Sequence, residues 1–431
     1  MASDVSSARF RYRRHRPEFV VNYTLCNWLR RQRRSAGDFR LDRARSGINQ
    51  ILFESCLEAE SLYRTCLMIQ ATRDPAPGND GVRLRDLGRS EVGEITRGLA
   101  ERVRNGRYMP QVPKLVLIPK PGNRGFRPIR LPGAADHIIA TAIHNPLAVA
   151  LNRILLPRCH GFRKRCSSWK MLAAIVVALS AAENTILLND DVRRAFEFVR
   201  VEQVLTMLHE LGLDTRLIDL IRSLVTVGND DRTIGIHQGS ELSPDLLNVL
   251  LHFVLDAPFR DRFPDVQLHR YADNLATVVP GSTAADAGRY HDEISQFLAT
   301  AGMELKREDG GIFDLSRQET TLLGFRLSKP QGRVLVQLPD TVETLVSDNL
   351  DELVRIEGHS RRRARECLLG WFGSLGPAFQ DMDVDQVCAI ALQTAGNLGF
   401  RNLVPAQQLR GRWASAYQRW ESMVRTARGQ S

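Results

Sequence analysis

The chain has 431 residues, which is long enough for two to four packed units around a sizeable core. A hydrophobic fraction of 43% and a charged fraction of 25% are typical of a globular protein and exclude a chain that is disordered throughout. The formal net charge of +10 favours a polyanionic partner, and because no uninterrupted apolar run reaches membrane-spanning length, nucleic acid is favoured over a membrane.

The cysteines and the first residues indicate the cell compartment. The seven cysteines are scattered and form no Cys-x-x-Cys pair, which indicates reduced thiols and no zinc site. The first residues lack a basic segment followed by an apolar core, so we expect no secretory signal and a cytoplasmic protein.

Residues 1–75 form a basic N-terminal extension in which most of the excess charge is concentrated. Residues 1–45 hold twelve arginines against four acidic residues, with Tyr12, Tyr23 and Trp28 interleaved among them. Arginine forks that bind phosphates and aromatic rings that stack on bases would make this segment a nucleic-acid arm. A solvated basic tail has the same composition, so both interpretations stay open.

The next residues predict an amphipathic segment over 84–104 and then a β-hairpin. Strand-type runs at 115–120 and 126–131 flank a Pro-Gly turn, which places Lys120 and Arg127 on neighbouring strands. Two cations on a hairpin suit a triphosphate, because Arg holds oxygens bidentately and Lys acts as a point charge. An exposed basic hairpin is the simpler alternative.

Residues 185–192 predict a strand that ends in Asp190 and Asp191. Side chains alternate along a strand, so only one of these acids can point at a given site. Further along, the loop at 234–244 leads into a helix, and we expect Ser243 to cap that helix.

The stretch 268–279 contains two strand-type runs separated by Asp273 and Asn274, which predicts an antiparallel hairpin with this pair at the turn. A carboxylate on such a turn is held rigidly at a sheet edge, a suitable place for a metal ion. Asp-Asn is also ordinary turn chemistry, so the pair alone does not decide between the two interpretations.

The C-terminal part changes composition. Residues 320–327 are typical of a closing strand. After Pro330, helical periodicity appears in four segments, so we expect a separate helical unit at 331–431; the segments are 341–356, 361–372, 384–394 and 407–428. The stripe Trp413, Tyr417, Trp420 and Val424 predicts a packing face of the last helix.

Seven short motifs, taken together and in this order, resemble those of reverse transcriptases, specifically prokaryotic enzymes related to group II intron-encoded ones. The motifs are Gly78-x-Asp80-Gly81, Ile118-Pro119-Lys120 with Arg127-Pro128, Gly161-Phe162-Arg163, Asp191-Val192-x-x-x-Phe196, Gln238-Gly239-x-x-Leu242-Ser243-Pro244-x-Leu246-x-Asn248, Tyr271-Ala272-Asp273 and Leu323-Gly324-Phe325. The resemblance implies an α+β right-hand polymerase fold with fingers and the start of the palm at 76–185, an antiparallel-sheet palm at 186–330 and a helical thumb at 331–431.

The resemblance also implies a catalytic centre for joining dNTPs to a primer on an RNA template. Asp191, Asp273 and the carbonyl of Val192 would bind two Mg²⁺ ions, with Mn²⁺ as an alternative, because hard dications require oxygen ligands on a rigid frame. Asn274 would complete the catalytic set.

The same resemblance assigns the nucleotide pocket. Lys120 and Arg127 would bind the triphosphate, and Gln238 would line the pocket. Phe196 lies where an aromatic ring crowds the 2′ carbon of the sugar, which favours dNTPs and argues for DNA synthesis over RNA synthesis.

Two positions depart from the family pattern. The family has a second Asp where this chain has Asn274, which removes a charge worth about 8 kcal/mol at ~4 Å from a dication with an effective dielectric near 20. A naturally weakened site and an inactivating substitution both fit this residue. Where the family has a Lys-Thr pair, this chain has Asp309, so Lys306 or Arg307 would have to replace that Lys.

The departures leave a second function open, a catalytically dead, reverse-transcriptase-like scaffold that binds RNA. An RNA-dependent RNA polymerase is a third interpretation, which Phe196 disfavours. Partners would be an RNA template, a DNA product or primer and dNTPs, with a structured non-coding RNA as a further candidate. Antiviral (phage) defence, a CRISPR-linked role, a retroelement and DNA repair all stay open, as does the oligomeric state.

Overall fold

The computed structural model describes residues 47–119, 125–181, 186–228, 234–279, 284–306 and 310–429. The chain divides into two compact units, Met1–Asp38 and Phe39–Ser431, and every described residue belongs to the second unit. Residues 1–46, which hold the Arg-rich part of the predicted nucleic-acid arm, lie outside the described residues, as do Lys120, Arg307 and Asp309. Among the helices that are described, none is long and apolar enough to cross a membrane.

The first described elements are helical. They are α3 (Phe53–Leu57), α4 (Ala59–Thr72), the 3-10 turn η1 (Leu84–Asp86) and α5 (Arg89–Arg104). The amphipathic segment expected over 84–104 consists of η1 and α5, which are separate because the backbone is extended at Leu87 and Gly88. The side chain of Gln70 donates to the carbonyls of Leu84 and Leu87, and Glu91 accepts from the Gly88 N–H, so both groups stabilise this break.

The predicted basic hairpin is present up to the edge of the described residues. Strands β1 (Lys114–Pro119) and β2 (Phe126–Leu131) pair antiparallel, with Ile118 opposite Arg127. The long helix α6 (Ala134–Ile154) follows directly.

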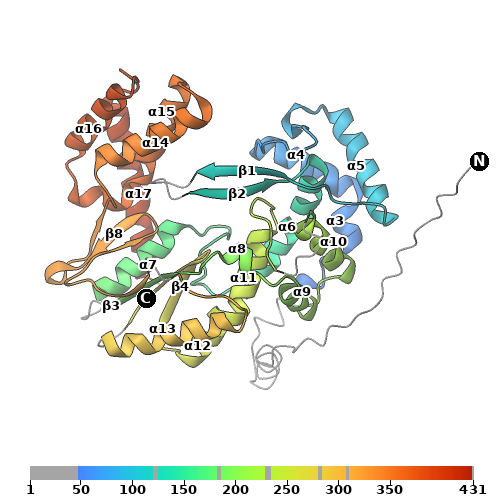
Figure 1. The fold of residues 1–431 in the computed structure, drawn as a ribbon, viewed down its shortest axis with the longest axis horizontal. Coiled ribbons are helices and arrows are strands. Elements are labelled where there is room, and N and C mark those ends of the chain that lie inside the picture. Colours follow the sequence, from blue (N-terminus) through green and yellow to red (C-terminus); the bar gives the residue numbers. More distant parts are fainter. Residues whose placement is uncertain are drawn as a thin grey trace, which may run out of the picture. The chain divides into compact units, whose positions relative to one another are not determined.

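A four-stranded antiparallel sheet lies at the centre of the unit (Figure 1). Its strand order is β4-β5-β3-β6, and the strands are β3 (Ile186–Asp191), β4 (Gln267–Tyr271), β5 (Asn274–Val278) and β6 (Gly311–Asp314). Helix α7 (Ser168–Ala181) contacts β4 and β5, whereas α13 (Ala284–Ala299) contacts β3 and β6. The central strand β3 is therefore held by backbone bonds on both edges.

The β4–β5 hairpin is present, but its turn is not the one expected. Tyr271 pairs with Asn274, so the two turn residues are Ala272 and Asp273, and Asn274 begins the second strand. The residue with a positive φ is Ala272 (+57°) and not an Asp or Asn. The prediction placed the turn one residue too late, because it relied on the turn preference of Asp-Asn.

The segment between β3 and β4 is helical. Its elements are α8 (Ala195–Phe198), α9 (Val201–Glu210), α10 (Thr215–Thr226), α11 (Ser243–Leu251), the π-helix η3 (His252–Asp256) and α12 (Ala257–Arg262). Ser243 was expected to cap α11, but it is the first helical residue and Leu242 precedes it as the cap. The Ser243 hydroxyl instead donates to the carbonyl of His237 and so fixes the preceding loop.

The expected closing strand at 320–327 is in fact a tight hairpin. Strands β7 (Thr320–Leu322) and β8 (Phe325–Ser328) flank Leu323 and Gly324, whose φ angles are both positive (+52° and +86°). These strands and β9 (Leu335–Gln337) form a separate three-stranded sheet, with the 3-10 turn η4 (Pro330–Gly332) between β8 and β9. Asn189 of β3 donates to Thr320 and Thr321, which joins the two sheets.

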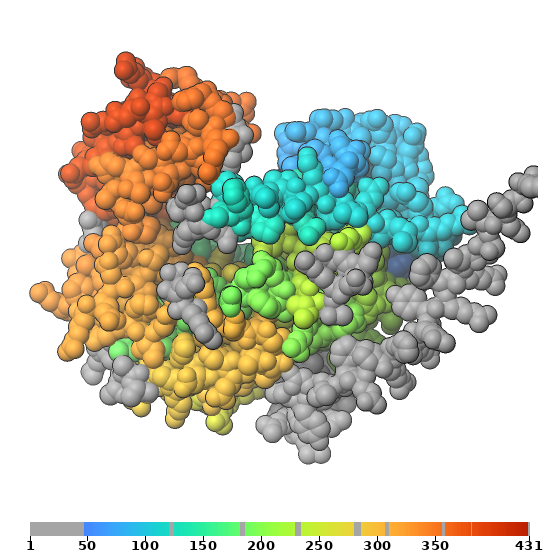
Figure 2. Space-filling view, viewed as in Figure 1, coloured from blue at the N-terminus to red at the C-terminus, as the bar shows by residue number. Residues whose placement is uncertain are grey.

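The helices expected in the C-terminal part are confirmed. They are α14 (Val342–Glu357), α15 (Arg361–Ser374), the 3-10 helix η5 (Gly376–Asp381), α16 (Val384–Asn397) and α17 (Ala406–Arg428). Trp413 and Trp420 of α17 are buried, which confirms the predicted packing face, and the ring of Trp420 contacts Trp169 of α7. Figure 2 shows a notch in the surface between the helices of residues 342–428 (orange to red) and α4 and α5 (blue), with the β1–β2 hairpin (cyan) on its floor.

The burial of Trp413 leads to a test of stability. Its side chain is fully buried against Phe372 and Phe379, and its indole N–H donates to the Leu375 carbonyl at 2.9 Å. Trp413→Ala should lower the free energy of unfolding by about 3–5 kcal/mol, because it leaves a cavity and an unpaired carbonyl. Urea denaturation measures the change. The exposed Gln418 on the same helix is the matched control, and Gln418→Ala should shift stability by less than about 0.5 kcal/mol. Similar values for the two variants would contradict the packing described.

Candidate active site

Two acidic residues that are far apart in the sequence lie together at the end of the central sheet. Asp191 is the last residue of β3 and stands opposite Asn274 in the β3–β5 ladder. The N–H of Val192 donates to the carbonyl of Asp273 at 2.9 Å. The structure thus brings together the three residues that the sequence placed at the metal and Asn274, which it placed in the catalytic set.

The electrostatics of this pair indicate a shortage of positive charge. Burial raises the pKa of Asp273, while a hydrogen bond with Asp191 and the charge of Arg127 offset part of that increase. Two carboxyl groups in contact cannot both ionise without repulsion, so a proton or a cation has to lie between them.

The neighbouring acid points to the opposite face of the sheet, as alternation requires. Asp190 is buried, and one of its carboxylate oxygens lies 3.6 Å from Nε2 of His291 on α13. Hydrogen bonding to Asp190 raises the pKa of His291. Asp190 is therefore held by α13 and not by the metal-site candidates.

The donor atoms available suit a hard cation that keeps several water ligands. Asp191 and Asp273 supply carboxylate oxygens, Asn274 an amide oxygen, and Val192 a backbone carbonyl. Within the described ranges, no cluster of three or more His, Cys, Asp or Glu side chains could hold a metal. Mg²⁺ is often bound by one or two carboxylates plus water and substrate phosphates, so two carboxylates are enough to fit it. Asn274 Nδ2 lies 3.4 Å from an oxygen of Asp273, and a donor there competes with a cation.

Of the residues expected to bind the triphosphate, the structure describes Arg127 but not Lys120. Arg127 is exposed on β2, and its charge lowers the pKa of Asp273, so the basic hairpin lies near the acidic pair. Lys120 lies outside the described residues. Lys306, the candidate substitute for the family Lys, donates its backbone N–H to the carbonyl of Asp191 at 2.7 Å.

Phe196 and Gln238 are joined to each other through the loop at 234–240. The N–H of Ile236 donates to the Phe196 carbonyl at 2.9 Å, and the Gln238 carbonyl accepts from the Arg130 N–H of β2 at 2.7 Å. Gly239 has a φ of +113°, and a Cβ there would lie 2.4 Å from the Arg130 carbonyl oxygen, so only glycine fits. The loop thus connects the hairpin that carries Arg127 with the helix that carries Phe196.

The motif Gly161-Phe162 connects this aromatic side to the acidic turn. A Cβ at Gly161 would lie 2.1 Å from the backbone nitrogen of Ala272, so the two backbones are in direct contact. The ring of Phe162 meets that of Phe196 edge-on at 6.1 Å, and 42% of Phe162 is exposed. Phe162 and Ala272 both have positive φ angles, which cost about 1–2 kcal/mol each in residues that carry a Cβ.

Sequence reasoning missed the polar groups beneath the turn. Arg270 and Asp256 form a fully buried ion pair with an N–O distance of 2.7 Å, and Asn248 bonds the same guanidinium at 2.9 Å. A signal was available, because an arginine inside a predicted strand that begins a metal-site hairpin requires a buried partner.

Comparison with known proteins supplies the family of the central part. Residues 118–327 match the family described as reverse transcriptase (RNA-dependent DNA polymerase). The chain is similar to the COX1/OXI3 intron 2 protein of Saccharomyces cerevisiae, with 28% identity over 32% of this chain and 16% of that protein. It is also similar to the uncharacterized 91 kDa protein in cob intron of Schizosaccharomyces pombe, with 24% identity over 38% of this chain and 23% of that protein.

Both relatives are proteins of introns by name, and the chain aligns with less than a quarter of the length of either one. The matched family segment contains the acidic pair, Arg127, Phe196 and Gln238. A reverse transcriptase domain is therefore present in residues 118–327 of this chain.

Proposed function

We propose that the chain is an RNA-directed DNA polymerase that adds dNTPs to a primer or priming hydroxyl. The contact between Asp191 and Asp273 at the end of the antiparallel sheet carries the proposal, because it lies inside the reverse transcriptase domain and leaves a need for positive charge. Reverse transcriptases use divalent metal ions, and the two carboxylates with the Val192 carbonyl and the Asn274 amide oxygen would hold them.

The metal chemistry is that of a two-ion site, with Mg²⁺ as the resident ion and Mn²⁺ as an alternative. Such ions, when bound, neutralise the triphosphate and make the primer hydroxyl easier to deprotonate. The protein's own contribution is geometric. The β3–β5 pairing and the hydrogen bond from Val192 to Asp273 fix the backbone at Asp191 and Asp273 before any ligand arrives, so little backbone reorganisation is needed on binding.

The nucleotide would lie between the acidic pair and the basic hairpin. Arg127 lies near the acidic pair and would bind triphosphate oxygens, together with Lys120. Phe196 would exclude a 2′-hydroxyl, and Gln238 would line the pocket. The hydrogen bond from Ile236 to Phe196 and the bond from Arg130 to Gln238 support this arrangement, because they fix both residues relative to β2.

The larger assignments belong to the same proposal. Fingers at 76–185, palm at 186–330 and thumb at 331–431 would form a right hand, with 1–75 as a basic N-terminal extension. The notch above the β1–β2 hairpin supports a path for an RNA template and a DNA product between the outer parts (Figure 2). The intron proteins among the relatives support the link to group II introns, whereas the prokaryotic kinship rests on the motifs alone.

One observation favours the alternative of an inactive RNA-binding scaffold. Asn274 brings an amide donor to the oxygen of Asp273 that a cation would use, and it removes a charge from the site. A scaffold would bind RNA in a salt-dependent way and would not extend a primer with either residue at position 274.

Restoring the acid separates the two functions. Asn274→Asp should raise primer extension on an RNA template and lower the Mg²⁺ concentration at half-maximal rate, because the added charge strengthens metal binding. Single-nucleotide extension at increasing Mg²⁺ measures both quantities, and chelation with EDTA should abolish extension. If Asn274→Asp incorporates no dNTP with any primer or metal, the scaffold is correct and the polymerase is not.

The two adjacent acids of β3 provide a matched pair of variants. Asp191→Asn should reduce extension at least about a hundredfold, since the metal supplies several kcal/mol of charge stabilisation. Asp190→Asn is the control on the opposite face of the sheet and should keep most of the activity. Thermal unfolding of both variants checks that the fold is retained. Equal losses of activity in two folded variants would remove the special role of Asp191.

Sugar selection tests the position of Phe196. Phe196→Ala should increase the use of rNTPs relative to dNTPs about tenfold or more, because removing a steric contact is worth about 1–3 kcal/mol in discrimination. Phe198 on the same short helix is the control, and Phe198→Ala should leave the ratio unchanged. Steady-state kcat/KM for each nucleotide gives the ratio, and an unchanged ratio in Phe196→Ala would place the sugar elsewhere.

A further inference from the structure

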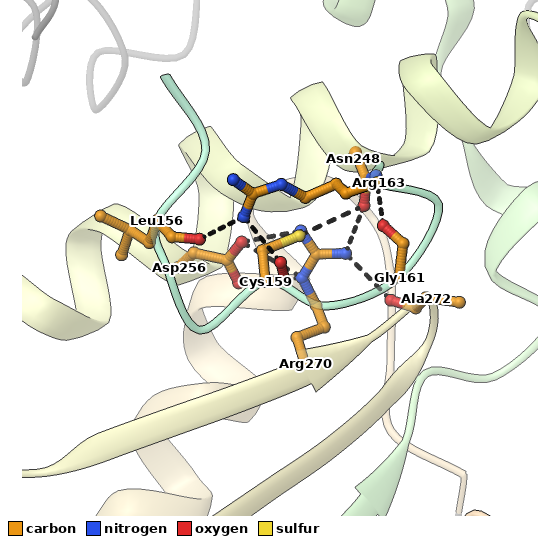
Figure 3. Close-up of polar contacts among 8 residues, drawn as sticks. All are labelled: Leu156, Cys159, Gly161, Arg163, Asn248, Asp256, Arg270 and Ala272. Atoms are coloured by element: carbon orange, nitrogen blue, oxygen red, sulfur yellow. Dashed lines mark hydrogen bonds and ion pairs between the residues drawn. The ribbon is translucent and has the colours of Figure 1, made fainter. Parts of the chain in front are cut away.

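Arg270 is the largest charged side chain buried in the described part of the chain, and its guanidinium bonds four different groups (Figure 3). Nε and Nη2 donate to the two oxygens of Asp256 at 2.9 and 2.7 Å. Nη1 donates to Asn248 Oδ1 at 2.9 Å and to the carbonyl of Ala272 at 3.0 Å, while Nη2 lies 3.1 Å from Cys159 Sγ. Only a planar fork with several donors can serve all of these acceptors at once.

Stability alone does not account for this arrangement. A buried ion pair loses much of its Coulomb attraction to the cost of removing both charges from water, and apolar residues of similar size are often as stable. The groups that Arg270 reaches beyond Asp256 are therefore informative. One is the turn that carries Asp273, and the other is the motif Gly161-Phe162.

The bond to Ala272 acts directly on the acidic turn. Ala272 has a φ of +57°, which an alanine adopts only when its surroundings impose it, and it immediately precedes Asp273. Its carbonyl accepts a charge-assisted hydrogen bond from Arg270, so the strained peptide is fixed in one orientation. That peptide group joins Ala272 to Asp273, so its orientation sets the position of the Asp273 Cα and Cβ atoms.

The bond to Asn248 acts on the other side of the same turn. The amide group of Asn248 accepts from Arg270 and donates to the carbonyl of Gly161 at 3.0 Å. The N–H of His160 in turn donates to the carbonyl of Arg270 at 2.7 Å. These bonds hold the backbone of Gly161 in contact with that of Ala272, and Figure 3 shows the two residues side by side.

A second arginine completes the loop that carries Phe162. Arg163 donates to the carbonyls of Leu156 and Cys159 at 2.6 and 2.7 Å, which closes the loop on itself (Figure 3). The loop therefore behaves as one piece whose attachment to the sheet passes through Arg270, Asn248 and the His160 N–H.

We propose that Arg270 is a positioning residue for the acidic site, acting through the Ala272 carbonyl on Asp273 and through Asn248 on the Gly161-Phe162 loop. The inference rests on the proposed function, and it makes a claim of its own about metal affinity and about the order of the hairpin. Arg270 does not touch the metal or the substrate in this account. It sets the orientation of the residues that do.

Two variants in the Asn274→Asp chain separate positioning from folding. Asp256→Leu with Arg270→Met replaces the buried pair by apolar residues of similar volume and so removes the bond to Ala272 without leaving an unpaired charge. Arg270→Lys keeps a charge for Asp256, but a point charge cannot also hold Asn248 and Ala272. The matched control is Glu202→Leu with Arg222→Met, which removes a different bidentate pair on α9 and α10.

The primary measurement is Mn²⁺ affinity, followed by electron paramagnetic resonance of the free ion. Both Arg270 variants should bind Mn²⁺ about tenfold or more weakly than the parent, as is usual when a group that orients a metal ligand is lost. Amide hydrogen exchange should become faster in the peptides that contain 186–192 and 271–278. In primer extension, kcat should fall while KM for dNTP changes little, and the control pair should change none of these values.

The outcomes distinguish this proposal from the proposed function. A folded variant with the Mn²⁺ affinity and hairpin exchange of the parent overturns the positioning role, whatever its extension activity. A parent that binds Mn²⁺ but extends no primer overturns the polymerase, and the affinities of the variants still decide the role of Arg270. If the double variant fails to fold, Arg270→Lys decides. If the parent binds no Mn²⁺, unchanged exchange in Arg270→Lys overturns the proposal and faster exchange supports it.

Discussion

The backbone pairing of β3 with β5 is the constraint on which the rest of the site depends. It sets Asp191 opposite Asn274 and, through the bond from Val192 to Asp273, brings two carboxyl groups together from distant parts of the sequence. β3 is also bonded to β6 along its other edge, so the pairing cannot slip by one residue without moving Asp191 to the face occupied by α13. Asp190 already occupies that face with His291 as its partner.

The pairing brings the carboxyl groups of Asp191 and Asp273 together, and the surrounding positive charges offset only part of the repulsion between them. The pKa of Asp273 is raised by burial, and among the described residues the charges of Arg127 on β2 and of the buried Arg270 interact with it. The remaining demand for positive charge is what makes the site suitable for divalent ions. The structure also places strain beside this demand, at Ala272 and Phe162, and it holds both residues with a network centred on Arg270. Strained residues next to a group of like charges are typical of sites organised for a ligand.

Much of the fold could be predicted because its signals are local. The alternating runs of β1, β2, β4 and β5 and the periodicity of α14 to α17 mark their elements in the sequence itself. The turns could not be located as well. Ala272 takes a positive φ at the β4–β5 turn, where Arg270 binds its carbonyl. The strand expected at 320–327 folds back at Leu323 and Gly324, so in both places turn chemistry and tertiary contacts override the strand pattern.

Some residues of the candidate site could likewise be predicted from the sequence, and others could not. The motifs identify Asp191, Asp273, Arg127, Phe196 and Gln238, and the structure places the first three in one neighbourhood and joins the last two through the 234–240 loop. The role of each of these residues stays a prediction. Arg270 inside a predicted strand implies a buried partner, but nothing in the sequence identifies the distant Asp256 as that partner, so the pair was not predicted.

The most direct test of the central claim is anomalous diffraction from crystals soaked in Mn²⁺. The account predicts an anomalous peak within bonding distance of carboxylate oxygens of both Asp191 and Asp273, and the loss of that peak in crystals of Asp191→Asn. Well-ordered Mn²⁺ bound elsewhere, with none between these two residues, would contradict it.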